Sequence, residues 1–139
     1  METSLVTCVI CPKGCSISVD WEWVEAEGKV GGAKEKKVLK VTGNSCPRGL
    51  KYATAEVIHP ERVLTSTIRV KNGSLALLPI RSATPIPKEA MMEAMKTISS
   101  SFVDASSFGA SGLKMGSVVI KNIAGTGIDM IASRDVQSL

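Results

Sequence analysis

Four cysteines are the residues of this 139-residue chain with the most evident capacity for chemistry. Cys8, Cys11 and Cys15 form a C-x2-C-x3-C segment, and Cys46 lies far downstream. A cubane [4Fe–4S] cluster needs one thiolate at each iron, so three local ligands and one remote ligand suit it. The spacing therefore predicts that the four cysteines form one metal site, a [4Fe–4S] cluster used for electron transfer.

The residues next to the cysteines agree with this interpretation. Pro47 follows the remote cysteine, as a proline does in a recurring iron–sulfur arrangement. Gly14 and Gly49 would let the backbone turn close to the sulfur atoms. Backbone N–H groups in such turns can donate hydrogen bonds to the sulfurs and tune the reduction potential of a cluster.

The spacing leaves two other uses of the thiols open. Structural zinc sites favour two pairs of the CxxC kind, whereas this chain has one, Cys8 and Cys11, followed by two separate cysteines. A structural zinc-binding interaction module without a redox role is the main alternative. A thiol–disulfide protein that acts through the same pair is the other, although no βαβ pattern surrounds the pair.

Basic residues accompany the cysteines in the sequence, namely Lys13, Arg48 and Lys51. They could offset the negative charge of a cluster, raise its potential and bind an acidic partner. They could equally be ordinary solvated side chains. We take Arg48 and Lys13 as the candidate cofactor-binding residues.

The sequence offers no side-chain set for hydrolytic or acid–base catalysis. Neither a Ser/His/Asp combination nor a pair of carboxylates in a supporting context is evident. His59, the only histidine, precedes Pro60, which predicts a turn rather than a metal ligand. We therefore expect a protein that is not catalytic on its own and that serves as an accessory to an oxidoreductase.

Two predicted strands would bring the remote cysteine back to the other three. Residues Ser16–Val24 alternate between apolar and polar, and Val38–Thr42 is a second short β-rich run. Antiparallel pairing of the two places Cys15, just before the first strand, beside Cys46, just after the second. The apolar face of the first strand carries Ile17, Val19, Trp21 and Trp23. The tryptophans would either shield a cluster or form a small core.

The second half of the chain has a mixed pattern. Residues Arg62–Val70 are β-rich, Asn72-Gly73 predicts a two-residue turn, and Ser74–Ile80 predicts the partner strand. Pro79 predicts that this strand ends there or lies at a sheet edge. A helix should follow Pro87, because four apolar residues recur at helical spacing: Met91, Met95, Ile98 and Phe102.

The last segments predict a loop and two more strands. Residues Ser99–Gly116 are rich in Ser and Gly and predict a mobile loop. Apolar runs at Ser117–Ile123 and Ile128–Ser133 predict the strands. The expected fold class is α+β, with a four-cysteine metal-cluster module at residues 1–56 and a small α+β module at residues 57–139.

Composition narrows the class of protein. The chain is 44% hydrophobic and 22% charged, with a net charge of +4, which permits an acidic partner but does not imply nucleic acid. It has no run of about 18 apolar residues, so no membrane span is expected. Its first residues lack the pattern of a signal peptide. We expect a cytoplasmic location, in which thiols stay reduced and bind metals.

Residues 5–52 resemble a known cluster-binding domain. The segments Thr7–Cys15 and Val38–Gly49 are similar to the N-terminal [4Fe–4S] domain of the molybdopterin oxidoreductases. The resemblance implies that the four cysteines bind the cluster. It also implies that Arg48 matches a basic residue between cluster and pterin. The remaining residues are too few for the pterin-binding domains, so the resemblance does not extend to molybdenum chemistry.

The whole chain also resembles a family of small, uncharacterised bacterial and archaeal proteins with paired CxxC cysteines. The matching segments are His59–Arg62, Leu64–Thr67, Leu78–Ile80, Pro85–Lys88 and Thr126–Asp129. Members tend to be encoded beside flavin-dependent dehydrogenases and FAD/NAD-linked oxidoreductases. The resemblance therefore implies an electron-transfer subunit or accessory of such an enzyme.

Overall fold

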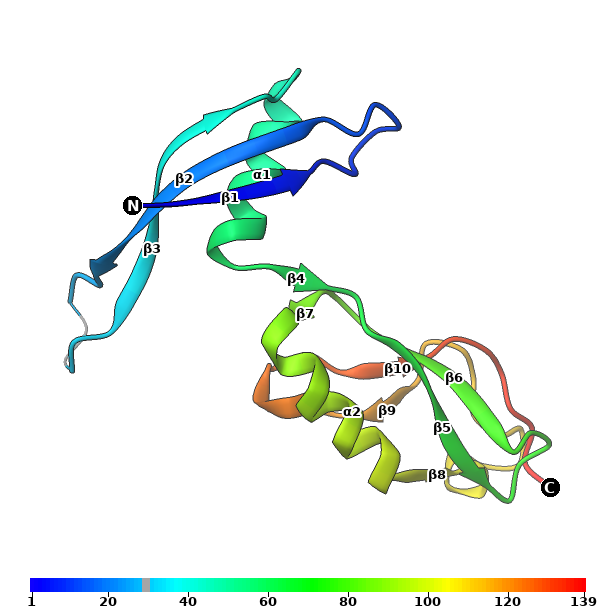
Figure 1. Ribbon diagram of the computed structural model, residues 1–139. Coiled ribbons are helices and arrows are strands. Elements are labelled where there is room, and N and C mark those ends of the chain that lie inside the picture. The colour runs from blue at the N-terminus through cyan, green and yellow to red at the C-terminus, as the bar shows by residue number, and fades with distance from the viewer. Residues whose placement is uncertain (29–30) are drawn as a thin grey trace. The chain divides into compact units, whose positions relative to one another are not determined.

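The computed structural model describes residues 1–28 and 31–139. The chain forms two compact units, Met1–Pro60 and Glu61–Leu139, each with its own sheet and helix (Figure 1). The fold is mixed α+β and strands predominate, which confirms the predicted class. The division that we expected near residue 56 falls inside a helix, and the chain divides at Pro60 instead.

The first unit is a three-stranded antiparallel sheet with one helix packed on it. The strand order is β1 (Glu2–Thr7), β2 (Ser16–Glu25) and β3 (Lys34–Thr42), and the helix is α1 (Pro47–Ile58). The predicted antiparallel pairing of the second and third strands is present. Strand β3 lies at an edge of the sheet, and lysines occupy four of its nine positions: Lys34, Lys36, Lys37 and Lys40.

The core of the first unit lies between β2 and α1. Ile17 and Val19 of β2 are fully buried, and they pack with Ala53 and Val57 of the helix. Helix α1 was not predicted from the sequence, because Gly49 suggested a turn; Pro47 is nevertheless well suited to the first position of a helix. The four-residue spacing of Ala53 and Val57 was the available signal.

The second unit contains a five-stranded sheet. Its order is β8 (Phe102–Asp104), β5 (Thr65–Lys71), β6 (Leu77–Ser82), β10 (Met130–Ala132) and β9 (Val118–Ile120). Only the β5–β8 pair among these is parallel. A two-stranded ladder joins β4 (Glu61–Arg62) to β7 (Ile86–Pro87). The helical segments are η1 (Lys88–Ala90), α2 (Met91–Ser100), η2 (Ala105–Phe108) and η3 (Ile123–Gly125).

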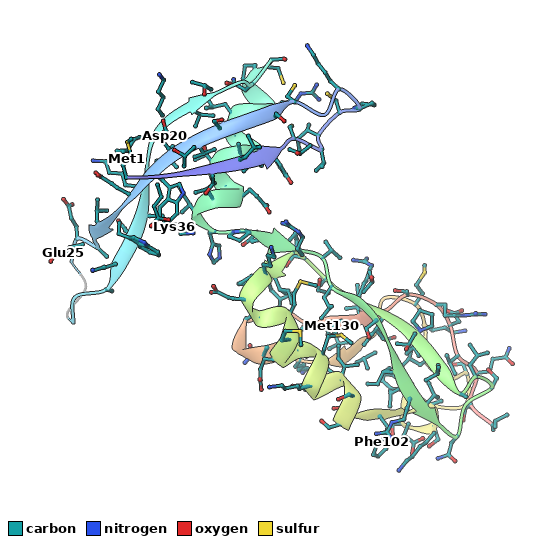
Figure 2. All side chains as sticks on the ribbon, viewed as in Figure 1. Met1, Asp20, Glu25, Lys36, Phe102 and Met130 are labelled. Carbon is teal, nitrogen blue, oxygen red and sulfur yellow. The ribbon has the colours of Figure 1, made fainter. Side chains whose placement is uncertain are left out.

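Helix α2 covers the apolar core of the second unit. Ala94 and Ile98 are buried, and Met130 of β10, labelled in Figure 2, is fully buried in the same cluster. The helix ends two residues before Phe102, the last residue of the predicted apolar stripe. Helix α2 stops at Ser100 because Ser101 is extended, so Phe102 begins strand β8 and is half exposed.

Pro79 does not end a strand or mark an edge, contrary to the prediction. It lies inside β6, between β5 and β10. Its carbonyl accepts a hydrogen bond from the Ser133 N–H at 2.9 Å, just past the end of β10. The N–H and C=O of one strand residue point to the same neighbouring strand. The missing N–H of Pro79 therefore faces β10, and the pairing of β5 with β6 loses no hydrogen bond.

The Asn72-Gly73 turn is wider than predicted. The Val70 N–H donates to the Ala76 carbonyl at 2.9 Å, so the connection is not a two-residue turn. Asn72 has a positive φ of 53°, but Gly73 does not, and a type I′ turn needs both. Gly73 instead pairs with Ser138, in a place where a Cβ would collide with Val70.

The segment predicted as a mobile loop, residues 99–116, contains ordered structure. Strand β8 pairs in parallel with β5, and η2 follows it directly. The Asp104 carboxylate accepts hydrogen bonds from the Ser106 N–H and from the Asn72 side-chain amide. Val103, Ala105 and Leu113 are buried. The serines and glycines of this segment form caps and tight turns, so their abundance did not indicate a mobile loop.

No helix in the described part of the chain is long and apolar enough to cross a membrane.

Candidate metal centre

The three local cysteines lie on the loop between β1 and β2. The Cys8 N–H donates to the Cys15 carbonyl at 2.8 Å, which closes the loop next to the last strand pair, Thr7 with Ser16. Gly14 has a φ of 63°, so it makes the turn that the sequence predicted. Cys8 is buried, while Cys11 and Cys15 are partly exposed.

The remote cysteine lies where β3 passes into α1. Gly43 ends the strand with a φ of 92°, and a Cβ there would collide with the Ser16 carbonyl oxygen. Cys46 then caps the N-terminus of α1. Figure 1 shows the β1–β2 loop and the β3–α1 connection at the same end of the sheet.

Two contacts join the remote segment to the loop. The Cys15 thiol lies 3.3 Å from the hydroxyl oxygen of Ser45, the residue before Cys46. Gly49, buried in the first turns of α1, approaches the loop so closely that a Cβ would lie 3.8 Å from the Cys8 sulfur. The antiparallel hairpin therefore brings the two cysteine-bearing segments together, as its pattern predicted.

The Gly49 backbone does not turn, contrary to our expectation. Gly49 is helical, and a Cβ would lie only 3.2 Å from the Cδ1 atom of Ile17. Its value to the site is therefore a lack of bulk, which lets α1 pack against β2 and beside Cys8.

The side chains are not drawn together into a coordination sphere. Within residues 1–28 and 31–139, no three His, Cys, Asp or Glu side chains are grouped closely enough to hold a metal ion. The structure thus brings the Cys8, Cys15 and Cys46 segments into proximity, and it places Cys11 on the same loop. The donor set itself, four thiols on two adjoining segments, has the chemistry that both iron–sulfur clusters and zinc require.

The surroundings of two thiols favour the thiolate form, which is the form that binds metals. The Ser45 hydroxyl lowers the pKa of the Cys15 thiol, and the charge of Lys13 adds a smaller effect. For Cys46 the backbone N–H of Gly49 contributes most to a lowered pKa, followed by Arg48. Both residues lie in the first turn of α1, so the N-terminus of the helix and the Arg48 charge act on the Cys46 thiol in the same direction.

Lys13 thus acts on the Cys15 thiol and Arg48 on the Cys46 thiol. Lys51 lies one helical turn beyond Arg48 and lines a shallow groove instead. This groove, which we call the α1 groove, has a volume of about 330 Å³ and is lined by Ile10, Arg48, Lys51, Tyr52 and Ala55. Its helical residues follow the spacing of one helix face, a pattern that was visible in the sequence once a helix was assumed.

The other residues considered in the sequence have structural roles. Trp21 pairs with Glu2 at the opposite end of the β1–β2 ladder from Cys15, so it does not shield the centre. It packs in the core, edge-on to Trp23 at 5.5 Å, with the ammonium of Lys36 (labelled in Figure 2) 4.4 Å from its ring centre. His59 ends α1, where its N–H donates to the Ala55 carbonyl.

The chain belongs to a family of proteins that is recognised from its sequence. The fold and the site describe a small α+β protein with four cysteines on two adjoining segments. Residues 47–134 match the family described as "Protein of unknown function (DUF1667)", and the chain belongs to this family. The match begins directly after Cys46. It covers α1 and most of the second unit.

One solved structure is similar to this chain. The NMR structure of Clostridium perfringens protein CPE0013 is 25% identical, covers 57% of this chain and 87% of its own, and aligns with a TM-score of 0.49. No curated protein matches the chain. The likeness of residues 5–52 to the molybdopterin oxidoreductases therefore stays a prediction from the sequence.

Proposed function

We propose that the chain binds a [4Fe–4S] cluster through Cys8, Cys11, Cys15 and Cys46. It would serve as an electron-transfer accessory or subunit of a flavin-dependent oxidoreductase. The observation that carries the proposal is the 3.3 Å approach of Ser45 to the Cys15 sulfur, because it returns the remote segment to the local loop. The lowered pKa values of the Cys15 and Cys46 thiols support the same assignment.

The surrounding residues would stabilise such a group. Lys13 and Arg48 lie beside the thiols and would offset the negative charge that a thiolate-bound cluster carries. The amide groups at the start of α1 would favour the same charge. A bound cluster would supply one-electron transfer, and the chain would set its potential and its access to solvent.

A second candidate function is a structural zinc site in a partner-binding module. The observation in its favour is that the cysteines span the junction of the β1–β2 loop and α1, where one metal ion would fasten a small sheet to its helix. Four thiolates are a standard ligand set for structural zinc. On this alternative the metal contributes folding energy and takes no part in redox chemistry.

Metal analysis of protein purified without oxygen decides between the two. The first proposal expects about four iron and four sulfide per chain, with visible absorbance that bleaches on reduction. One zinc per chain without visible absorbance would contradict it and support the zinc module. Cys46→Ser should abolish or destabilise the cluster, whereas Ser18→Ala, at a partly buried position of β2, serves as the control.

The electron-transfer step needs its own measurement. A flavin-dependent dehydrogenase that has been reduced by its substrate should bleach the cluster of the loaded protein. The rate of bleaching should rise with the concentration of the dehydrogenase. Failure to exchange electrons with any such enzyme, despite a redox-active cluster, would remove the accessory role and leave the cluster assignment standing. We place the protein in the cytoplasm on the same argument, because reduced thiols are required for loading.

A further inference from the structure

The α1 groove lies directly beside the candidate metal centre. Ile10 stands on the loop between Cys8 and Cys11, and Arg48 follows Cys46 by two positions. The groove is therefore built from the same two segments that carry the cysteines. A molecule seated in it would lie next to the loop that we propose to hold the cluster.

The same two segments expose aliphatic side chains to solvent. Val9 is 69% exposed, Ile10 47% and Leu50 43%. Single exposed aliphatic residues are ordinary. Here, however, three of them stand on the loop and the helix turn that form a groove with an apolar floor, Tyr52 and Ala55. Apolar surface bordered by polar residues is typical of interaction sites.

The border of the groove is positively charged. Arg48 and Lys51 line it, and Lys13 lies on the same cysteine loop. Between Cys46 and His59 the only acidic residue is Glu56, which does not line the groove. An occupant with carboxylates around an apolar centre would therefore complement both the charge and the polarity of this surface.

We propose that the α1 groove is the docking surface for an acidic patch of a partner protein. The inference rests on the proposed function, because it identifies the partner as the flavin-dependent oxidoreductase that exchanges electrons with the cluster. Redox complexes are small and transient, and an apolar centre with a charged rim provides fast association without a large buried area. A partner seated there would bring its flavin domain to the face of the protein nearest the cysteines.

The proposal is tested by photo-cross-linking with the full chain in the cells that produce it. A benzoylphenylalanine replaces Ile10 in the groove, or Leu39 on β3, which is 44% exposed and lies outside the groove. Adducts are identified by mass spectrometry. We expect a flavoprotein joined to the Ile10 probe through a peptide rich in Asp and Glu, and no such adduct with the Leu39 probe.

Charge reversal provides the second variable. Lys51→Glu should lower the yield of the flavoprotein adduct roughly three- to tenfold, since a rim charge acts mainly on the association rate. Lys40→Glu, on the exposed edge strand β3, makes the same change in net charge and should leave the yield unchanged. Equal effects of the two variants, equal adducts from the two probes, or an adduct only to a second copy of this chain would overturn the proposal.

Failure of the docking surface and failure of the cluster assignment give different results. The iron content and visible spectrum are measured on the same Lys51→Glu and Lys40→Glu preparations. An intact cluster together with no groove-specific adduct overturns the docking surface alone. A groove-specific, charge-dependent flavoprotein adduct with a colourless zinc protein supports the docking surface and overturns electron transfer through a cluster.

Discussion

At the scale of single residues, the candidate centre depends on small side chains as much as on thiols. Gly43 lets the end of β3 pass against Ser16, and Gly49 lets α1 approach β2. Gly43 admits only glycine, because it has a positive φ and a Cβ there would collide with the Ser16 carbonyl, whereas a Cβ at Gly49 would require the Ile17 side chain to shift. Each glycine therefore helps to set the distance between the Cys46 segment and the cysteine loop.

Replacing Gly43 with alanine should destabilise the first unit. The alanine would have to adopt an unfavourable φ, and its Cβ would also collide with the Ser16 carbonyl. We therefore expect the free energy of unfolding to fall by about 2–4 kcal/mol. Gly32→Ala, at a φ of 67° with open space around it, should cost only about 1 kcal/mol. Urea unfolding followed by tryptophan fluorescence measures both. Equal losses would show that the contact with Ser16 is unimportant.

Asp104 should make the second unit sensitive to acid. Hydrogen bonds from Ser106 and Asn72 lower the pKa of its carboxyl group in the folded protein. The associated stabilisation is then fully present above the carboxyl's ordinary pKa, near about 3.9, and is lost as the pH falls through the lower folded-state value. Asp104→Asn should thus destabilise the unit at pH 7 and lose this effect in strong acid.

Thermal unfolding from neutral to strongly acid pH tests this sign. Glu89→Gln, which removes another carboxylate charge from the same unit, is the control. It separates the effect of the lost charge from the effect of the lost hydrogen bonds. A stability difference between the wild type and Asp104→Asn that stays constant down to strong acid would contradict the prediction.

At the scale of elements, the two helices contribute through narrow buried faces. Helix α2 buries Ala94 and Ile98, while Met92 on the same helix is 72% exposed. Ile98→Ala should therefore cost about 2–5 kcal/mol, because it opens a cavity in the core of the second unit. Met92→Ala should cost little. Chemical denaturation of both variants checks this, and similar costs would mean that α2 does not pack as described.

The elements also show which signals a sequence carries. Strand β2 could be predicted because Ile17, Val19 and Trp21 alternate over a buried face. The β2–β3 pairing followed from it, and so did the return of Cys46 to the loop. Helix α1 carried a weaker signal, the spacing of Ala53 and Val57, and the reason for a glycine in its first turns became clear only from the contact with Ile17.

Other elements depended on contacts distant in sequence. Strand β8 could not be predicted because Phe102 continues the helical spacing of α2. The segment is a strand only through its parallel pairing with β5, in which Phe102 lies opposite Arg69. Pro79 was predicted to lie at a sheet edge because a sequence does not show toward which neighbouring strand the missing N–H of a proline points. The contact of Ser45 with Cys15 and the α1 groove were likewise invisible before the fold was known.

At the scale of the whole molecule, the candidate metal centre belongs to one compact unit only. Every cysteine lies within Met1–Pro60, and the second unit has a separate core. Metal loading should therefore stabilise the first unit, by linkage between binding and folding, and leave Glu61–Leu139 nearly unchanged. We therefore expect that loss of the proposed metal would leave the structure of the second unit intact.

Hydrogen exchange with mass spectrometry on the full chain measures this separation. Removal of the metal by a chelator should speed exchange in β1, β2 and α1, with peptides of β5, β6 and α2 as internal controls. Cys46→Ser should reproduce the pattern without a chelator. Uniform loss of protection across both units would show that the metal centre supports the entire fold.

The lysines along β3 bear on how this protein behaves at high concentration. A nine-residue edge strand is a template on which another chain could add a strand, and such additions lead to aggregates. Two copies meeting along this edge would bring Lys34, Lys36, Lys37 and Lys40 against the same residues. Their repulsion opposes strand addition, and salt or acetylation of the lysines weakens it. Storage at low ionic strength should therefore keep the protein in solution longest.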